Sequence, residues 1–400
     1  MQTNETPAPS GNGGEAAAQA PAQAPAPATA TTTARVGPAA GVTDVEGRAR
    51  LALAQQEFDP EVVYLNTASM GLPPHRSLAA LRVHEEEWRR GTASAAAYDA
   101  PLAAARDGYA ALVGVDPSHV AVGSQVSTFV GLVAASLPEG SEVLTAAGEF
   151  TSVVFPFHAQ ERRGVRVREV PLDSLAEEVG PRTALVAVAA VQSADGRLAD
   201  LDALTAACEA HGARVLLDTT QATGWLPVDA SRYAYTVGGG YKWLLAPRGT
   251  CFFTVRPEYA AELLPHWAGW YAGEERWESL YGAPLRLAKD ARRFDVSPVW
   301  PAWVGQAPAL ELLGGIGPSV LHDHALGLAN RFRSAVGLPH GDSAIVSAAV
   351  DAGTPAELKR AGIASSTRAG RMRLAFHLYN TEADADRTAE VVAGRLTGDG

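Results

Sequence analysis

The amino-acid sequence predicts an α/β protein. Its large domain has three layers, a mostly parallel sheet with helices on both faces, and a smaller C-terminal α/β domain follows. Three observations lead to this prediction: apolar runs of strand length recur along the chain, they alternate with helix-like stretches, and one is apolar at every position. Strands buried on both faces have this continuous pattern, and helical connections between them make neighbouring strands parallel.

The expected strands of the large domain follow one another at regular intervals. The first, His119–Val122, precedes a polar turn at 123–125 and a helix-periodic stretch at Ser127–Leu137. The others are Glu142–Ala146, Ala184–Ala190, Arg214–Leu217, Tyr233–Val237 and Cys251–Val255. Because Cys251 follows the preceding strand too closely for a helical crossover, we expect the last strand to be antiparallel.

One helix has clear signals at both ends. Asp200 can accept hydrogen bonds at the start of Leu201–His211, and Gly212 can end it. The C-terminal part predicts a long helix at Ala302–Leu313, an apolar run at Met372–Phe376 and a final helix at Asp384–Leu396. We therefore divide the chain into a disordered Ala-, Pro- and Thr-rich tail at 1–41, a large domain at 42–299 and a small domain at 300–400.

The composition excludes several classes of function. Of 400 residues, 47% are apolar and 19% charged, and the net charge is −11. A large core is therefore possible, whereas the basic surface that nucleic acid requires is not expected. No apolar run approaches the ~18 residues of a membrane span, and the first residues lack a secretion signal. Two cysteines cannot build a disulfide framework or a Cys-based zinc site, so we expect a cytoplasmic protein without a metal.

Lys242 is the first residue that suggests chemistry. The chain has only three lysines, and this one lies in the apolar, glycine-rich segment GGGYKWLLAP at 238–247. Burial of an ammonium group lowers its pKa, and a neutral lysine is a nucleophile that forms Schiff bases with carbonyls. Taken alone, such a lysine is more often one that reaches solvent from a loop.

Two further features give Lys242 a context. Asp218 ends an expected strand, where ligands of parallel sheets bind, although such a residue can also be a helix N-cap. The turn at 123–127 precedes a helix, and its N–H groups with Ser127 could bind an anion or form an ordinary cap. Together, an anion site, a strand-end acid and a buried lysine describe a site for pyridoxal 5′-phosphate (PLP).

Two segments also carry a resemblance to a known family. DTTQATG at 218–224 and GGGYKWLLAPRG at 238–249 resemble the signature of class V aminotransferases. This family belongs to fold type I of the PLP-dependent enzymes. It includes aminotransferases, cysteine desulfurases, kynureninases, isopenicillin-N-epimerase-like proteins and C–S lyases. The resemblance runs from about Tyr64 to Arg395, nearly the whole chain after the tail.

The resemblance implies roles for cofactor-binding residues. Lys242 matches the Schiff-base lysine, Asp218 the acid that faces the pyridine nitrogen, and Gln221 the residue near the pyridine hydroxyl. The remaining matches are Val126 and Ser127 in the phosphate turn, Phe150 as the stacking ring, and Tyr241 as a phosphate contact. Ser193 is included although the family often has Asn in that segment, which is a departure from the pattern.

For the substrate, the resemblance implies that Arg373 binds the carboxylate, with Arg371 as the rival, and that Asn66 lies in the entry segment over the site. Desulfurases have Ser and His before the lysine, where this chain has Gly239-Gly240-Tyr241. They also have a catalytic Cys in the C-terminal part, whereas this chain has no cysteine after Cys251. A persulfide-forming desulfurase is therefore not expected.

The implied function is an enzyme that holds PLP as an internal aldimine and removes the Cα proton of an amino acid. We expect an aminotransferase. A C–S or other side-chain lyase and an epimerase share the early steps and stay open. Consumption of a keto-acid acceptor would indicate an aminotransferase, and release of ammonia without an acceptor would indicate a lyase. A non-catalytic binding protein on this fold is the alternative of another class. The resemblance also implies a homodimer.

Overall fold

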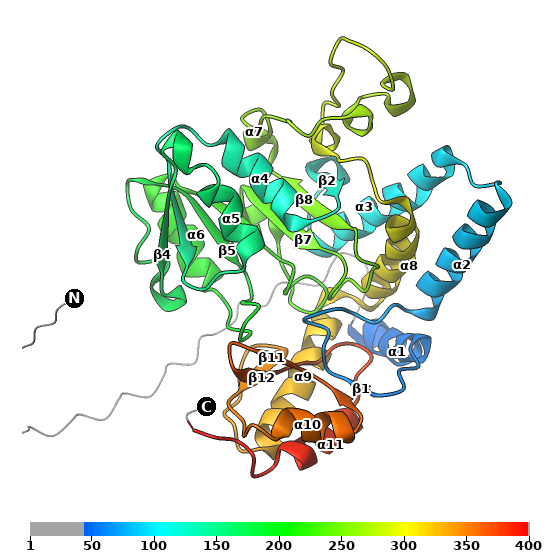
Figure 1. The fold of residues 1–400 in the computed structure, drawn as a ribbon, viewed down its shortest axis with the longest axis vertical. Coiled ribbons are helices and arrows are strands. Elements are labelled where there is room, and N and C mark those ends of the chain that lie inside the picture. The colour runs from blue at the N-terminus through cyan, green and yellow to red at the C-terminus, as the bar shows by residue number, and fades with distance from the viewer. Residues whose placement is uncertain (1–43, 399–400) are drawn as a thin grey trace, which may run out of the picture. The chain divides into compact units, whose positions relative to one another are not determined.

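The computed structural model describes residues 44–398. The predicted tail at 1–41 lies outside these residues. The described chain contains a seven-stranded sheet in the order β2-β8-β7-β6-β5-β3-β4 (Figure 1). Its strands are β2 (Val120–Gly123), β3 (Glu142–Ala146), β4 (Arg166–Val170), β5 (Thr183–Ala189), β6 (Arg214–Asp218), β7 (Tyr235–Gly239) and β8 (Cys251–Val255).

The expectation of a mostly parallel sheet is confirmed. Strands β4, β3, β5, β6 and β7 pair in parallel, and β8 pairs antiparallel with both of its neighbours, as its short connection predicted. Only β4, at one edge, has no counterpart among the predicted strands. It reads RVREV, and its three arginine and glutamate side chains interrupt the apolar pattern that identified the others.

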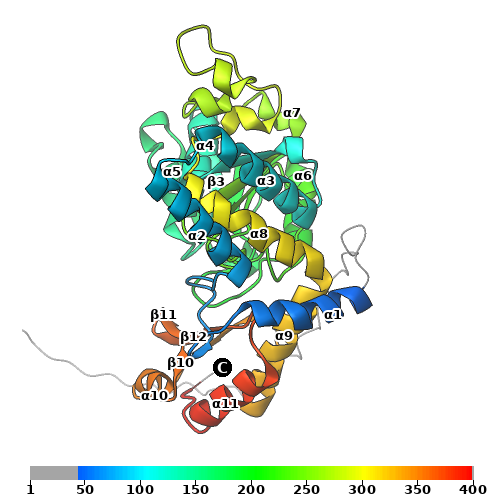
Figure 2. The same ribbon diagram turned by 90° about the vertical axis from the view of Figure 1, so that its right-hand side faces the viewer.

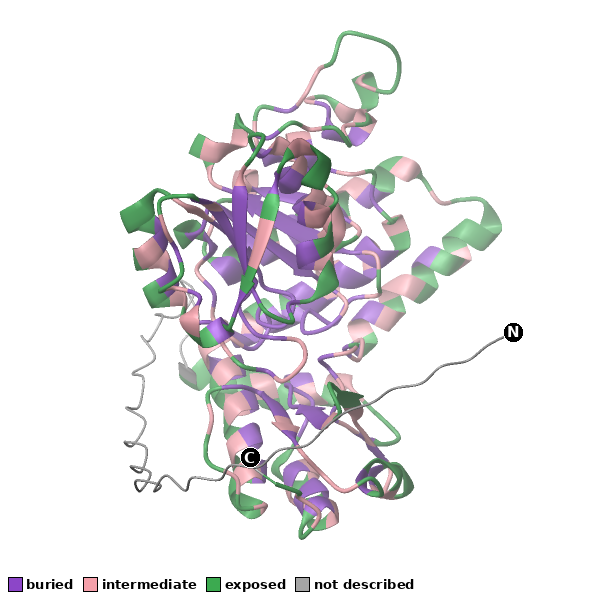
Figure 3. Ribbon diagram, turned by 60° about the vertical axis from the view of Figure 1, so that its left-hand side comes forward, coloured by how far each residue is buried: buried purple, intermediate pink, exposed green. Residues whose placement is uncertain are grey.

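Helices cover both faces of the sheet. On one face, α4 (Val126–Ser136) and α5 (Thr151–His158) pack on side chains such as Val143 and Phe253. On the other face, α6 (Leu201–His211) packs on Val186 and Leu217, and α3 (Asp99–Val113) and α8 (Trp300–Ile316) pack farther along. Figure 3 shows that most of the sheet between these layers is buried. Alternate residues of each strand serve the two cores, because successive side chains point to opposite faces.

The predicted signals of α6 are present in the structure. The Asp200 side chain accepts a hydrogen bond from Ala203 N, and Gly212 ends the helix in the left-handed conformation with φ 67°. The final helix, α11 (Glu382–Val392), is shorter than predicted. It begins at a capping box formed by Thr381 and Asp384, and it ends because Ala393 takes an extended conformation.

The C-terminal part contains a three-stranded antiparallel sheet. Its order is β11 (Ser366–Arg368), β12 (Arg371–Ala375) and β9 (Ile345–Ala348), and β12 matches the predicted apolar run. Helices α9 (Pro318–Ala335), α10 (Thr354–Arg360) and α11 accompany it. Strand β1 (Val63–Tyr64) pairs in parallel with β10 (Ile363–Ala364), so the entry segment of the chain lies beside this part (Figure 1).

Helix α8 connects the two parts. Its apolar side chains, Trp303 and Leu310 among them, belong to the core that it shares with α3, and α2 (His75–Arg90) lies beside it (Figure 2). The helix α1 (Asp44–Ala54) also packs on α8, and α7 (Pro257–Ala260) follows β8. The boundary between the domains at 299/300 stays a prediction. No helix in residues 44–398 is long and apolar enough to cross a membrane.

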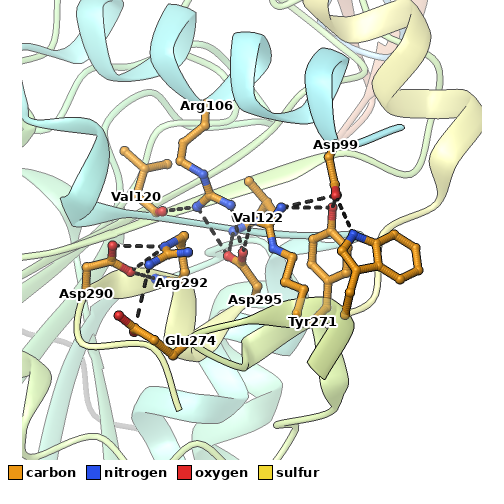
Figure 4. A network of polar contacts seen from close by, with 11 residues as sticks. Asp99, Arg106, Val120, Val122, Tyr271, Glu274, Asp290, Arg292 and Asp295 are labelled. Atoms are coloured by element: carbon orange, nitrogen blue, oxygen red, sulfur yellow. Dashed lines mark hydrogen bonds and ion pairs between the residues drawn. The ribbon is translucent and has the colours of Figure 1, made fainter. Parts of the chain in front are cut away.

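The long connection from β8 to α8 is attached to the edge strand β2. Asp295 accepts hydrogen bonds from Arg106 Nη2 at 2.7 Å and from Val122 N at 2.9 Å (Figure 4). Val296 N in turn donates to Val122 O at 2.9 Å. Both charged side chains of this ion pair are buried. These bonds satisfy backbone polar groups of the edge strand β2 that would otherwise lack a partner.

Candidate active site

A cavity of about 730 Å³, which includes its open mouth, lies at the carboxyl ends of the parallel strands. Segments that directly follow β2, β3, β5, β6 and β7 line it, because these strand ends meet at one edge of the sheet. The structure brings together in its wall all eight residues predicted to bind the cofactor: Val126, Ser127, Phe150, Ser193, Asp218, Gln221, Tyr241 and Lys242.

Lys242 is 5% exposed and lies in the turn after β7. Its Nζ atom lies 5.5 Å from the ring centroid of Phe150 and 5.6 Å from that of Tyr241. Within residues 44–398, no hydrogen bond or ion pair holds this amine. The pKa of Lys242 is lowered to about 8, chiefly by burial; the charge of Asp218 opposes this shift, and those of nearby arginines add to it. The geometry therefore favours a partly neutral, nucleophilic amine over a lysine in solvent.

Asp218 is buried at the end of β6, and its Oδ1 accepts a hydrogen bond from Thr220 N at 2.8 Å. Burial raises the pKa of this carboxyl, while the bonds from Thr220 and the charge of Lys242 lower it. Turns, not a helix, follow the strand. The carboxylate is therefore no helix N-cap, and it is available to a positively charged group in the cavity.

Gln221 connects three parts of the site. Its Nε2 donates to Ala68 O at 2.9 Å and to Ser193 Oγ at 3.1 Å, and its Oε1 accepts from Trp243 Nε1 at 2.8 Å. Because these partners engage both ends of the amide, Gln221 orients Ser193. The hydroxyl hydrogen of Ser193 stays free to donate into the cavity, since its oxygen is the acceptor from Gln221.

Glu149 is a site residue that sequence reasoning missed. Its buried carboxylate accepts hydrogen bonds from Phe150 N at 2.7 Å, Ala189 N at 2.8 Å and Gln192 Nε2 at 2.9 Å. Burial raises its pKa, and these three donors oppose the shift. The residue thereby ties the segment of Phe150 to the end of β5. Only its position beside Phe150 in the sequence could have indicated it.

The donors around the cavity fit PLP. Helix α4 begins at Val126 without a side-chain cap, so its first N–H groups and Ser127 suit a phosphate, as does Arg248, which within residues 44–398 lies over the Tyr241 ring and forms no ion pair. The buried carboxylate of Asp218 suits a protonated pyridine nitrogen, and the amine of Lys242 suits an aldehyde. The sequence motif next to Lys242 contained Arg248, but nothing in the pattern distinguished it from a surface residue.

Arg373 on β12 is 1% exposed and lies just outside the cavity wall. It donates to Ser193 O, to Ser69 Oγ at 2.9 Å and to Ser366 Oγ at 3.2 Å. Burial and then the charge of Arg368 lower its pKa to about 10. The rival, Arg371, bonds instead to Ser347 Oγ at 3.3 Å and makes none of these contacts. The geometry therefore favours Arg373 as the residue near the substrate.

Asn66 does not line the cavity. Its Oδ1 is buried without a hydrogen-bond partner, and its carbonyl accepts from Ser69 N at 2.9 Å and Met70 N at 3.2 Å. It therefore shapes the turn that carries Ser69 toward Arg373.

His322 lies away from the cavity and stacks on Trp225, with ring centroids 5.9 Å apart. Across residues 44–398 no cluster of three or more His, Cys, Asp or Glu side chains could hold a metal.

Comparison with known families gives a match over much of the chain. The model described as Aminotransferase class-V matches residues 83–337, more than half of the chain. Among curated proteins, isopenicillin N epimerase of Streptomyces clavuligerus is 28% identical over 88% of this chain and 98% of its own length. A kynureninase of Deinococcus radiodurans is 29% identical over 72% of this chain and 75% of its own length.

Solved structures show the same fold. The cystine C–S lyase C-DES, in complex with cysteine persulfide, has a TM-score of 0.75 at 23% identity and covers 84% of this chain and 98% of its own. The cysteine desulfurase CsdA of Escherichia coli has a TM-score of 0.71 at 19% identity, with 88% and 98% covered. At these identities the likeness concerns the α/β architecture.

Proposed function

Since the chain belongs to the class V aminotransferase family, whose members are PLP-dependent enzymes, we propose that it converts an amino acid by removing its Cα proton. The observation that carries the proposal is Lys242, a buried amine without an ion pair whose pKa is lowered to about 8. Such a group can act as both a nucleophile and a general base near neutral pH.

We assign the binding of PLP to the cavity wall. The N-terminus of α4, Ser127 and Arg248 would hold the phosphate, Asp218 the ring nitrogen, and Lys242 the aldehyde carbon. When bound, PLP supplies a carbonyl that joins amines and a ring that accepts electron density from the substrate. Asp218 supports this because its buried negative charge keeps a proton on the ring nitrogen.

The chain's own groups perform the remaining tasks. Arg373 binds the substrate carboxylate through its guanidinium, whose orientation Ser193, Ser69 and Ser366 fix by hydrogen bonds. The Nζ atom of Lys242 would take the Cα proton of the substrate. Phe150, whose N–H donates to Glu149, would offer its ring to the face of the bound cofactor.

The chemistry after proton removal decides the class of enzyme. We propose an aminotransferase, in which Lys242 would deliver the proton to a carbon other than Cα. An epimerase is the second candidate, because a relative of that name aligns with 88% of this chain. A C–S or other side-chain lyase stays a third. A persulfide route is disfavoured because both cysteines, Cys208 and Cys251, are buried and burial raises their pKa values.

The visible spectrum of the PLP-loaded protein tests the proposal. The band of lysine-bound PLP should appear in the wild type and in Lys289→Ala, a control at an exposed lysine, but not in Lys242→Ala. Borohydride should abolish the band in the first two. A wild-type protein that takes up no PLP would contradict the enzyme assignment and favour a non-catalytic binding protein.

The fate of a responsive amino acid separates the candidates. Transamination consumes a keto-acid acceptor, a lyase releases ammonia without one, and an epimerase inverts Cα without net loss of substrate. Exchange of the Cα hydrogen with deuterated water should occur in all three cases. We also propose a cytoplasmic homodimer, which sedimentation of the holoenzyme would check. A monomer with full activity would contradict the dimer alone.

A further inference from the structure

The hairpin of β11 and β12 carries arginines on one face. Arg368 pairs with Arg371 across the strands, and Ser366 pairs with Arg373, so these four side chains share a face. Met372, between two of them, is buried on the opposite face. A hairpin of this kind usually mixes charges, because like charges directly opposite each other are destabilising.

Two of these arginines converge on the entry segment. Ser69 Oγ accepts from Arg373 Nη2 at 2.9 Å and from Arg368 Nη2 at 3.2 Å. The two guanidinium nitrogens are thus no farther apart than the sum of these distances. In the described part of the chain, both groups donate to neutral hydroxyl and carbonyl oxygens, and neither forms an ion pair with a carboxylate. The pair is therefore an unneutralised double positive charge beside the cavity.

The two arginines differ in depth. Arg373 is 1% exposed, whereas Arg368 is exposed near the tight turn of the hairpin. Along a strand, two residues span about 6.6 Å, so Arg368 stands one such step outward from Arg373. Both charges lower the pKa of Lys242, so both act electrostatically on the reacting amine. A ligand with one carboxylate at the inner site could reach the outer site with a second.

We propose that Arg368 binds a side-chain carboxylate of the substrate while Arg373 binds the α-carboxylate, so that the substrate is a dicarboxylic amino acid. This inference rests on the proposed function, because it takes the neighbouring cavity as the place of reaction. A second carboxylate would neutralise the charge that the hairpin leaves unpaired, with Ser69 holding the two guanidinium groups in register. Arg368 is then a specificity residue for an acidic side chain.

Binding of non-reacting anions to the PLP-loaded protein tests the inference. Glutarate has two carboxylates, and glutaramate is nearly the same molecule with one of them replaced by an amide. Calorimetry should show that the wild type binds glutarate about tenfold more tightly, the size expected for one lost charge-assisted interaction. Arg368→Gln should bind the two equally, and Arg368→Lys should keep part of the preference.

Arg371→Gln is the matched control, because Arg371 shares the hairpin face and the charge but contacts Ser347 and not Ser69. It should keep the wild-type preference. Equal binding of both anions by the wild type, or equal loss of preference in Arg371→Gln and Arg368→Gln, would overturn the inference. Weaker binding of glutaramate by Arg368→Gln would also overturn it, since Arg368 would then serve the α-carboxylate. Neither anion has an amine that could react with PLP. The binding result therefore does not depend on the spectral test of Lys242, and failure of one test can be told from failure of the other.

Discussion

The free amine of Lys242 should destabilise the cofactor-free protein at neutral pH, and Lys242→Met should remove that penalty. Burial lowers the pKa of Lys242 from its ordinary 10.5 to about 8. In the unfolded chain the amine keeps its ordinary pKa. Between these two values the unfolded state therefore binds more protons than the folded state, and the free energy of unfolding rises with pH.

The pKa difference sets the size of the effect. One pKa unit corresponds to about 1.4 kcal/mol, so the penalty is roughly 3 kcal/mol. It is fully present below the folded-state pKa, where both states hold the proton, and absent above 10.5, where neither does. Met has a similar length and no proton to lose. From pH 7 to pH 10 the wild type should gain about 2.5 kcal/mol relative to Lys242→Met.

Urea unfolding of the PLP-free proteins at the two pH values measures this difference. Changes in packing caused by Met are the same at both pH values, and the other titrating groups occur in both proteins. Both effects therefore cancel from the pH dependence of the stability difference between the two proteins. Lys289→Met replaces an exposed lysine and should show no such pH dependence. A stability difference between wild type and Lys242→Met that is the same at both pH values would refute the reasoning.

Three further predictions concern buried polar groups. Asp295→Ala should lower the free energy of unfolding by about 3–5 kcal/mol in urea denaturation, because it leaves the charge of Arg106 buried and unpaired; a loss below that of Asp295→Asn would contradict this. Arg373→Lys should raise the KM for the amino acid about tenfold or more in steady-state assays, because Lys cannot form the bidentate contact; an unchanged KM would exclude Arg373 as the carboxylate site. Glu149→Gln should lower stability by about 1–3 kcal/mol in thermal melts, since an NH₂ group then faces N–H donors that include Phe150 N; an unchanged melting temperature would show that these bonds are not stabilising.

Local patterns were sufficient for much of the large domain. The strands at Glu142–Ala146 and Cys251–Val255 begin and end where the apolar runs do, and Asp200 and Gly212 bound their helix as expected. Strand β4 was not predicted, because an edge strand is exposed and does not need a continuous apolar run. The final helix was predicted too long because periodicity does not register the conformation of a single residue such as Ala393.

The cofactor site shows the same division. Motif and spacing were enough to predict that Lys242 and Asp218 share one cavity, because Asp218 ends β6 and Lys242 lies in the turn after the neighbouring strand β7. They could not reveal that the Gln221 amide is engaged by three partners. The motif favoured Arg373 but left Arg371 as its rival, because both residues lie on the same face of the strand.

The sequence by itself determined the class of fold and the family of this protein and predicted Lys242 as its nucleophile, because hydrophobic periodicity and a contiguous motif are properties of neighbouring residues. Only the tertiary structure decided which groups surround that nucleophile. Ser69 meets Arg368 and Arg373 across about three hundred positions of the chain, and Ser193 meets Arg373 across 180. Such contacts depend on how the C-terminal hairpin packs beside the entry segment and the sheet, and no local pattern encodes that packing.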